Sequence, residues 1–298
     1  MTDLSAADTG AARERSATRV DAHHHVWDLA TRDQPWTADI EPLRRSFTFD
    51  ELRPQLSRAG IDATVLVQTI SVAEETPELL ALAAACPEIR GVVGWVDLSA
   101  QDVSARLAEL RDLPGGEHLV GIRHQVQGEA DPQWLLRPDV TRGLRAVAAA
   151  GLVYDLLVTE AQLPAAVEAV RRHPDLRFVL DHGGKPLIAA GEVEPWRSNV
   201  TALSEQPNVT VKLSGLLTEA SADWTVDDIR PYVDHLVEAF GPARTMFGSD
   251  WPVSTLRAGY DDVVAVTEEL TAQLSPDERA AVFATTALSS YQLERASA

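Results

Sequence analysis

The chain has 298 residues, of which 45% are hydrophobic and 24% charged, a composition typical of a globular protein rather than a disordered or membrane one. Lysine and arginine number 26 against 45 aspartates and glutamates, so the formal net charge is −19. A field of that sign repels phosphate backbones and argues against a nucleic-acid partner. No apolar run approaches the ~18 residues of a membrane-spanning helix, so no membrane association is expected.

Residues 1–18 are small, polar and charged, and they lack the apolar stretch of a signal peptide. We therefore expect a disordered N-terminal tail over 1–18, one domain over 19–298, and a cytoplasmic location. Cys86 is the single cysteine, which excludes an intramolecular disulfide and a thiolate metal cluster.

From residue 19 onward, short β-branched runs alternate with helix-like segments. The expected strands are the opening stretch 20–27, then 61–68, 89–98, 119–126, 152–158, 176–181, 209–213 and 245–248. The expected helices between them cover 49–59, 78–85, 103–113, 140–150, 163–172, 196–205 and 229–240. Eight such units in one α/β domain predict a parallel sheet closed into a (β/α)8 TIM barrel. A doubly wound open sheet is the alternative, but the Gly-x-Gly-x-x-Gly turn typical of its dinucleotide-binding members is absent.

The longest irregular stretch, 28–46, directly follows the first expected strand and contains Pro35, Trp36 and Pro42. In a barrel, the loop after a strand lies over the end where enzymes hold their active sites. Loops of this length are commonly functional, so we expect a lid here.

Polar side chains gather where the expected strands end. His23 and His25 are two residues apart on one strand and therefore point to the same face. Later strands end in Arg123 and His124, Tyr154 and Asp155, Asp181 and His182 with Lys185, Lys212 and Ser214, and finally Asp250. Each of these residues alone could be a structural partner. Because the carboxyl ends of barrel strands surround one mouth, the set together predicts an active site.

The motifs occur in the order Asp-Ala-His-x-His with a following Trp, Gly-Ile-Arg-His, Tyr-Asp-Leu-Leu, Asp-His-Gly-Gly-Lys-Pro, Lys-Leu-Ser-Gly-Leu and Met-Phe-Gly-Ser-Asp-Trp-Pro-Val. This order resembles the amidohydrolase superfamily over about residues 20–293, and most of all its sugar-lactonase branch, of the L-fuconolactonase and L-rhamnonolactonase type. The resemblance implies a (β/α)8 barrel that hydrolyses an aldonolactone to the aldonic acid. It also implies that His23, His25, His182 and Asp250 stand where the superfamily places its metal-binding and proton-transferring residues.

Lactone hydrolysis requires a base that deprotonates water and groups that stabilise the oxyanion. We expect Asp250 to be the base, with His182, His124 and Arg123 as the other catalytic residues. The lactone itself is the expected partner. Trp27, Tyr154, Lys185 and Arg123 are expected to bind it, with Trp27 stacked on the sugar ring.

A metal ion is the least settled expectation. The bridging lysine of a two-metal amidohydrolase centre would lie on the strand that carries Arg123 and His124, and a permanent cation there disfavours two divalent ions. We expect at most one zinc-like ion, on His23, His25, His182 and Asp250; the alternative is a metal-independent site in which these groups hold the substrate.

Two other functions fit the same residues. One is a metal-dependent carboxy-lyase of the same superfamily, which would release carbon dioxide instead of adding water. The other is a non-catalytic sugar-acid binding protein. The oligomeric state is open, and a homo-oligomer is compatible with the sequence.

Overall fold

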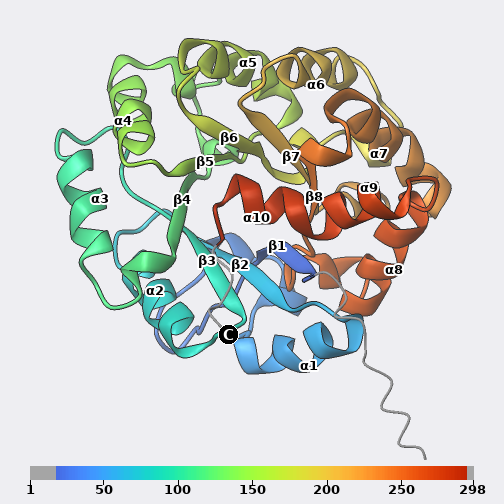
Figure 1. The fold of residues 1–298 in the computed structure, drawn as a ribbon, viewed down its shortest axis with the longest axis horizontal. Coiled ribbons are helices and arrows are strands. Elements are labelled where there is room, and N and C mark those ends of the chain that lie inside the picture. Colours follow the sequence, from blue (N-terminus) through green and yellow to red (C-terminus); the bar gives the residue numbers. More distant parts are fainter. Residues whose placement is uncertain (1–17, 294–298) are drawn as a thin grey trace, which may run out of the picture.

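The computed structural model describes residues 18–293, so the tail expected over 1–18 lies, except for its last residue, outside the described residues. Eight parallel strands form one sheet in which each strand pairs with the next along the chain (Figure 1). The strands are β1 Val20–His24, β2 Ala63–Val67, β3 Ile89–Gly94, β4 Leu119–His124, β5 Val153–Leu156, β6 Arg177–Leu180, β7 Val209–Leu213 and β8 Thr245–Phe247. This order confirms the predicted (β/α)8 barrel and excludes the doubly wound sheet.

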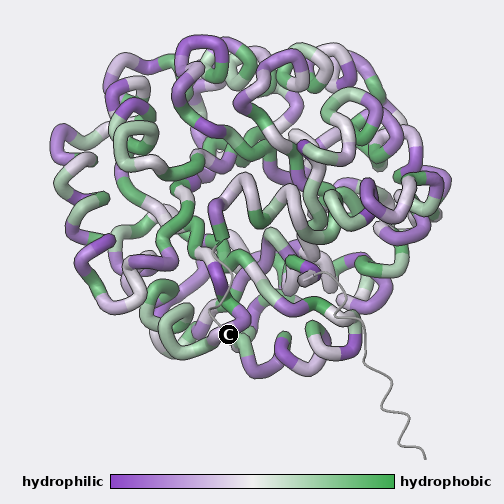
Figure 2. Tube along the Cα trace, in the orientation of Figure 1, coloured by the Kyte–Doolittle hydropathy of each residue, from purple (hydrophilic) through white to green (hydrophobic). Residues whose placement is uncertain are grey.

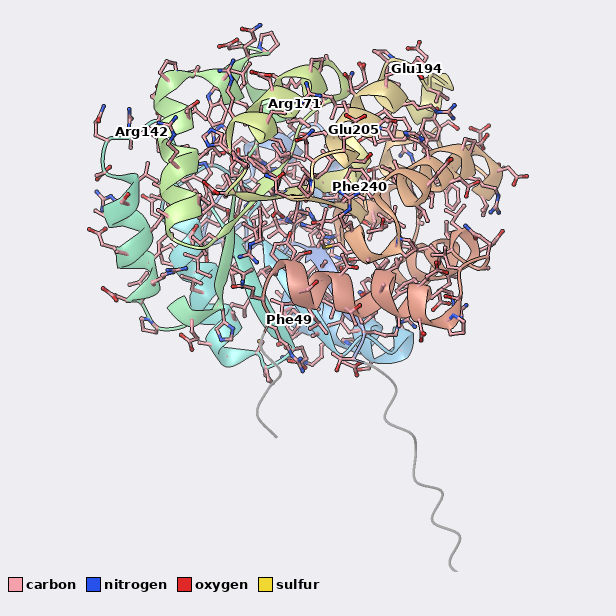
Figure 3. All side chains as sticks on the ribbon, turned by 45° about the horizontal axis from the view of Figure 1, so that its top comes forward. Phe49, Arg142, Arg171, Glu194, Glu205 and Phe240 are labelled. Atoms are coloured by element: carbon pink, nitrogen blue, oxygen red, sulfur yellow. The ribbon has the colours of Figure 1, made fainter. Side chains whose placement is uncertain are left out.

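The helices form the outer layer. They are α1 Phe49–Ala59, α2 Glu75–Ala85, α3 Val103–Arg111, α4 Pro138–Ala149, α5 Leu163–Arg172, α6 Trp196–Ser204, α7 Val226–Phe240, α8 Tyr260–Leu270, α9 Pro276–Ala280 and α10 Thr286–Ser290. Local sequence sets their ends: α1 begins at a capping box formed by Thr48 and Glu51 and ends at Gly60, whose φ is 65°. Exposed side chains such as Arg171 on α5 and Glu194 and Glu205 beside α6 lie on this layer (Figure 3).

The barrel closes between its first and last strands. β8 is short, but the residues after it continue alongside β1: the Asp250 N–H donates to the His23 carbonyl oxygen at 2.8 Å, and the His25 N–H donates to the Trp251 carbonyl oxygen at 2.7 Å. Asp250 is thereby brought beside the two histidines.

Alanine and valine side chains, with one methionine, fill the barrel below the site: Val20, Ala22, Ala63, Val65, Val67, Val93, Val153, Val179 and Met246. Tyr291 and Leu293, which follow α10, pack against this cluster. They close the floor of the barrel, and α9 and α10 cross in front of the strands in Figure 1. Hydrophobic residues run along the strands, whereas hydrophilic ones concentrate on the outer helices (Figure 2). Within residues 18–293, no helix has the length and hydrophobicity needed to cross a bilayer.

Candidate active site

The two-residue spacing on β1 brings His23 and His25 together, as predicted. Their Nε2 atoms are 3.1 Å apart and the rings meet edge-on, with an interplanar angle of 82°. His24, between them, points to the other face of the strand, where its Nε2 lies 3.0 Å from the Thr64 hydroxyl. The alternation of a strand therefore delivers two of the three consecutive histidines to the mouth of the barrel.

Asp250 follows β8 and faces both histidines. Its Oδ1 lies 3.4 Å from His25 Nε2 and 3.7 Å from His23 Nε2. Its backbone φ is 56°, a left-handed conformation that aspartate tolerates better than most residues. Burial alone would raise the pKa of Asp250, but two effects outweigh it and lower that pKa: the charge of His182, which is protonated only at acid pH, and the contacts with His25 and His23. The carboxylate is therefore ionised at neutral pH.

His182 lies beyond β6, also with a left-handed backbone, at φ 54°. Its Nδ1 shares a hydrogen bond of 2.9 Å with the Ser214 hydroxyl. A Cβ at position 215 would lie 2.5 Å from this nitrogen, so only glycine fits there. Burial lowers the pKa of His182 to about 4, against the opposing effect of Asp250. The imidazole is thus neutral at neutral pH.

Arg123, on β4, brings a permanent cation to the same centre and is only 2% exposed. Its Nη1 donates to Asp181 Oδ2 at 3.0 Å and lies 3.3 Å from His23 Nε2. Its other terminal nitrogen donates to the backbone carbonyl of Gln68. These contacts fix the guanidinium in one orientation.

A cavity of about 190 Å³ opens above these groups. Lys185 lies at its edge, where its Nζ donates to Glu219 Oε1 at 2.9 Å. The remaining lining is mainly neutral and comprises Trp36, Thr69, Gln125, Gln127, Leu157, Thr218 and Val253, together with His25, His182, Arg123 and Asp250. The structure thus brings five predicted residues to one cavity: His25, Arg123, His182, Lys185 and Asp250.

Three residues that were expected to be catalytic or to bind substrate lie outside this cavity: His124, Tyr154 and Trp27. For the first two, the alternation of side chains along a strand is the reason. Arg123 and His124 are adjacent on β4, as are Tyr154 and Asp155 on β5, and adjacent strand residues point to opposite faces. Tyr154 is fully buried and packs on Phe178 between the barrel and the helices. The expectation that His124 and Tyr154 share the pocket with their neighbours is corrected.

His124 lies in a pocket of its own outside the barrel. It stacks on Trp134 at 4.2 Å between ring centroids, accepts a hydrogen bond from Trp95 Nε1 at 3.0 Å and contacts Glu129 Oε1 at 2.8 Å. Both ring nitrogens are therefore already partnered, and the imidazole is unavailable to the substrate.

Trp36, rather than Trp27, is the tryptophan of the cavity. Trp27 is 5% exposed, packs edge-on against Phe47 and donates through Nε1 to the Arg45 carbonyl oxygen at 2.6 Å. Trp36 lies in the single-turn helix Pro35–Thr37 of the long loop and reaches the cavity from there. The long loop over 28–46 therefore reaches the cavity through Trp36, whereas Trp27, which precedes the loop, does not line it.

Sequence reasoning also missed the amides of the cavity. Gln125 follows Arg123 by two residues, so the strand periodicity extended just beyond β4 could have found it, whereas Gln127 lies in the single-turn helix Val126–Gly128, where that periodicity does not hold. Thr69 lies on a loop and Thr218 in the single-turn helix Leu217–Glu219, and neither position carries such a signal.

The donor atoms of His23, His25 and Asp250 have the spacing of a metal site, with separations of 3.1, 3.4 and 3.7 Å. In a tetrahedral zinc site with bonds of about 2.0–2.1 Å, ligand atoms are about 3.4 Å apart. His182 belongs to a second possible group, with His23 and Asp181. The surroundings of His23 do not fit, because the Arg123 guanidinium lies 3.3 Å from its Nε2 and repels a divalent ion there.

Comparison with known proteins agrees with this architecture. The amidohydrolase family model matches residues 20–293. The L-fucono-1,5-lactonase of Burkholderia ambifaria is 39% identical over 284 residues, which cover 94% of this chain and 97% of the relative. A crystal structure of an amidohydrolase from Burkholderia multivorans with bound zinc is 39% identical, covers 93% of this chain and 100% of that one, and has a TM-score of 0.87. A 2,6-dihydroxybenzoate decarboxylase from Rhizobium shares the fold, with a TM-score of 0.64 at 15% identity, covering 93% and 99% of the two chains. The chain therefore belongs to the amidohydrolase family.

Proposed function

We propose that this protein is a hydrolase that opens a sugar lactone to the corresponding aldonic acid. One observation supports the roles of base and oxyanion stabiliser: the ionised carboxylate of Asp250 and the guanidinium of Arg123 line the same cavity, and both lie near His23 Nε2. Asp250 Oδ1 and Arg123 Nη1 lie 3.7 and 3.3 Å from His23 Nε2. A base beside a fixed cation is what water attack on a carbonyl requires. The L-fucono-1,5-lactonase relative, similar over almost its whole length, supports the same reaction class.

In the proposed reaction, Asp250 accepts a proton from water while the water oxygen attacks the lactone carbonyl carbon. Arg123 donates hydrogen bonds to the oxyanion that forms. The bond between that carbon and the ring oxygen then breaks, and the protonated Asp250 returns its proton to the ring oxygen, which leaves as a hydroxyl. The product is the open-chain acid, which ionises by releasing a proton to solvent. No step is routed through a metal ion.

The lowered pKa of Asp250 has two effects on this reaction. The base form is fully populated at neutral pH, but its intrinsic basicity is modest. General-base strength follows pKa, so a weaker base needs more help from preorganised charge. The fixed orientation of Arg123 supplies that help.

The cavity favours a neutral, hydroxyl-rich ring. Its volume of about 190 Å³ is small, and its lining offers amides, hydroxyls and the indole of Trp36. Both of its cations are already paired, Arg123 with Asp181 and Lys185 with Glu219. A carboxylated substrate would find no unpaired cation among the described lining residues, which is one reason to prefer a lactone to the carboxylate substrate of a carboxy-lyase.

A metal test follows from the guanidinium beside His23. We expect at most one divalent ion per chain, weakly held, and we expect activity to survive dialysis against a chelator because Arg123 supplies the positive charge. Elemental analysis and assays before and after dialysis measure both. Two tightly held ions, or activity that is lost and then restored by zinc, would contradict the expectation.

The function is tested with a panel of D- and L-aldonolactones and a pH indicator, since ring opening releases acid. At least one lactone should turn over. Asp250→Asn keeps the shape but cannot accept the proton, so kcat should fall about 10²- to 10⁴-fold, equivalent to roughly 3 to 5 kcal/mol. Asp262→Asn, at an exposed carboxylate on α8, is the matched control and should keep the wild-type rate.

Other outcomes separate the alternatives. A folded Asp250→Asn protein with near-normal turnover would remove Asp250 as the base. Product that has lost carbon dioxide by mass would indicate a carboxy-lyase. Saturable binding of the panel without any turnover would indicate a sugar-acid binding protein.

A further inference from the structure

A buried cation with no role in the proposed reaction lies directly beneath the site. Lys212, on β7, is fully buried inside the barrel. Its Nζ lies 2.6 Å from Asp155 Oδ2, 2.9 Å from Asp181 Oδ1 and 3.1 Å from His23 Nδ1. An ammonium group has three N–H donors and no acceptor, and here it faces three acceptor atoms.

The contact with His23 has a direct consequence. Because Lys212 can only donate, Nδ1 of His23 must be the accepting nitrogen, and a neutral imidazole then carries its proton on Nε2. Cations lie at both ends of this ring, with Lys212 Nζ at 3.1 Å and Arg123 Nη1 at 3.3 Å, so a third positive charge on the ring is disfavoured.

The next ring fits the same proton placement. His25 Nδ1 lies 2.7 Å from the Val67 carbonyl oxygen, which only accepts, so this nitrogen carries the His25 proton. With one proton on the ring, the lone pair of His25 is then on Nε2, 3.1 Å from His23 Nε2. A directional chain results, in which Lys212 donates to His23, His23 to His25, and His25 to the backbone.

The opposite tautomer of His23 has longer contacts on both sides. It would place the proton on Nδ1, with Asp181 Oδ1 at 3.4 Å as acceptor, and leave Nε2 to accept from Arg123 at 3.3 Å. Each tautomer directs one N–H at a cation, either at Lys212 Nζ, 3.1 Å from Nδ1, or at Arg123 Nη1, 3.3 Å from Nε2, and the shorter of these two contacts weighs against a proton on Nδ1. The chain with two contacts of 3.1 Å is the better arrangement.

The floor of the barrel holds Lys212 in place. Tyr291 donates its hydroxyl to Asp155 Oδ2 at 2.7 Å, and its ring centroid lies 5.3 Å from Lys212 Nζ. We propose that Lys212 is a positioning residue, anchored by Asp155 and Tyr291, which keeps the His23 proton on Nε2 and so engages the lone pair of His25. The two nitrogens with metal-site spacing are thereby held in a hydrogen bond to each other instead of being free as metal ligands.

The proton position can be measured on the wild-type protein. In protein labelled with ¹⁵N only at its eight histidines, long-range ¹H–¹⁵N spectra distinguish the two tautomers and the imidazolium. His23→Gln identifies the His23 signals by their loss. We expect the Nε2–H tautomer at neutral pH. A proton on Nδ1, or on both nitrogens, overturns the proposal whether or not any variant folds.

Variants test the role of Lys212. Lys212→Met alone leaves Asp155 and Asp181 with less compensation, which would attract zinc by charge alone. Lys212→Met combined with Asp155→Asn removes one charge of each sign while still removing the donor to His23. In this double variant we expect the His23 proton to move to Nδ1 and the zinc Kd to fall at least about tenfold, that is, by about 1.4 kcal/mol.

Asp155→Asn alone is the matched control, because the amide oxygen of asparagine can still accept a hydrogen bond from Lys212 Nζ and so keep Lys212 in contact with His23; its His23 tautomer should be that of the wild type. A double variant that melts as a folded protein but retains the Nε2–H tautomer and the wild-type zinc affinity would reduce Lys212 to a structural ion-pair partner. The two measurements are the position of the His23 proton and the zinc affinity. Neither depends on the outcome of the lactonase assay.

Discussion

At the scale of single residues, His124 shows how a histidine can be excluded from chemistry by its partners. Burial lowers its pKa, against the raising effect of Glu129. The structural reason is that Nδ1 accepts from Trp95 Nε1 at 3.0 Å, a contact that a proton on Nδ1 would abolish. The folded state therefore holds the neutral ring, while the unfolded chain protonates near the ordinary pKa of about 6.5.

A prediction for stability follows with a definite sign. Because the folded-state pKa is lowered, the unfolded chain binds more protons between about pH 6.5 and the folded-state pKa, and the free energy of unfolding falls as pH falls through that window. Urea titrations at pH 7.5 and 5.0 measure this loss. His124→Gln, which has no titrating ring, should reduce the pH dependence, whereas His118→Gln near the protein surface should change it less. Equal slopes in all three proteins would contradict this account.

At the level of elements, two tryptophans near the first strand have different roles: Trp27 immediately precedes the loop over 28–46, and Trp36 lies within it. Trp27 is buried against Phe47, whereas Trp36 lines the cavity. Trp36→Ala should therefore raise KM for the lactone about tenfold, equivalent to about 1.4 kcal/mol of binding, and leave stability nearly unchanged. Trp27→Ala should cost about 3 to 5 kcal/mol of unfolding free energy. Steady-state kinetics and urea titrations on both variants check this, and exchanged effects would reverse the assignment.

The periodicity of the strands and helices determines which parts of the fold and site could be predicted from the sequence. The eight strands were predictable because β-branched runs recur between helical segments, and the pairing of His23 with His25 was predictable because strand periodicity is two. The same periodicity places His124 and Tyr154, the strand neighbours of Arg123 and Asp155, on the outward face.

Other parts of the site had no local signal. Trp36 reaches the cavity from an irregular loop, and Lys212 meets Tyr291, a residue of the barrel floor far along the chain. Contacts of this kind depend on how the barrel closes, and no periodicity within one segment encodes them.

At the scale of the whole molecule, the net charge of −19 acts on anything that approaches the cavity. Raising the ionic strength from about 10 mM to about 100 mM shortens the Debye length from about 30 to about 10 Å. We therefore expect kcat/KM for a neutral lactone to be nearly independent of salt, and kcat/KM for a lactone bearing a carboxylate to rise severalfold. Stopped-flow or indicator assays across this range provide the test. An anionic lactone that reacts faster at low salt would reveal a local basic field that the ion pairs described above do not predict.

The closure of β1 against the residues after β8 also has a consequence for biosynthesis. The strand that carries His23 and His25 is translated early, yet its hydrogen-bonding partner around Asp250 and Trp251 leaves the ribosome more than two hundred residues later. The floor residue Tyr291 follows later still. In a nascent chain, His23 and His25 are therefore made long before the residues that surround them in the folded barrel. The complete site can form only when synthesis of the barrel is almost finished.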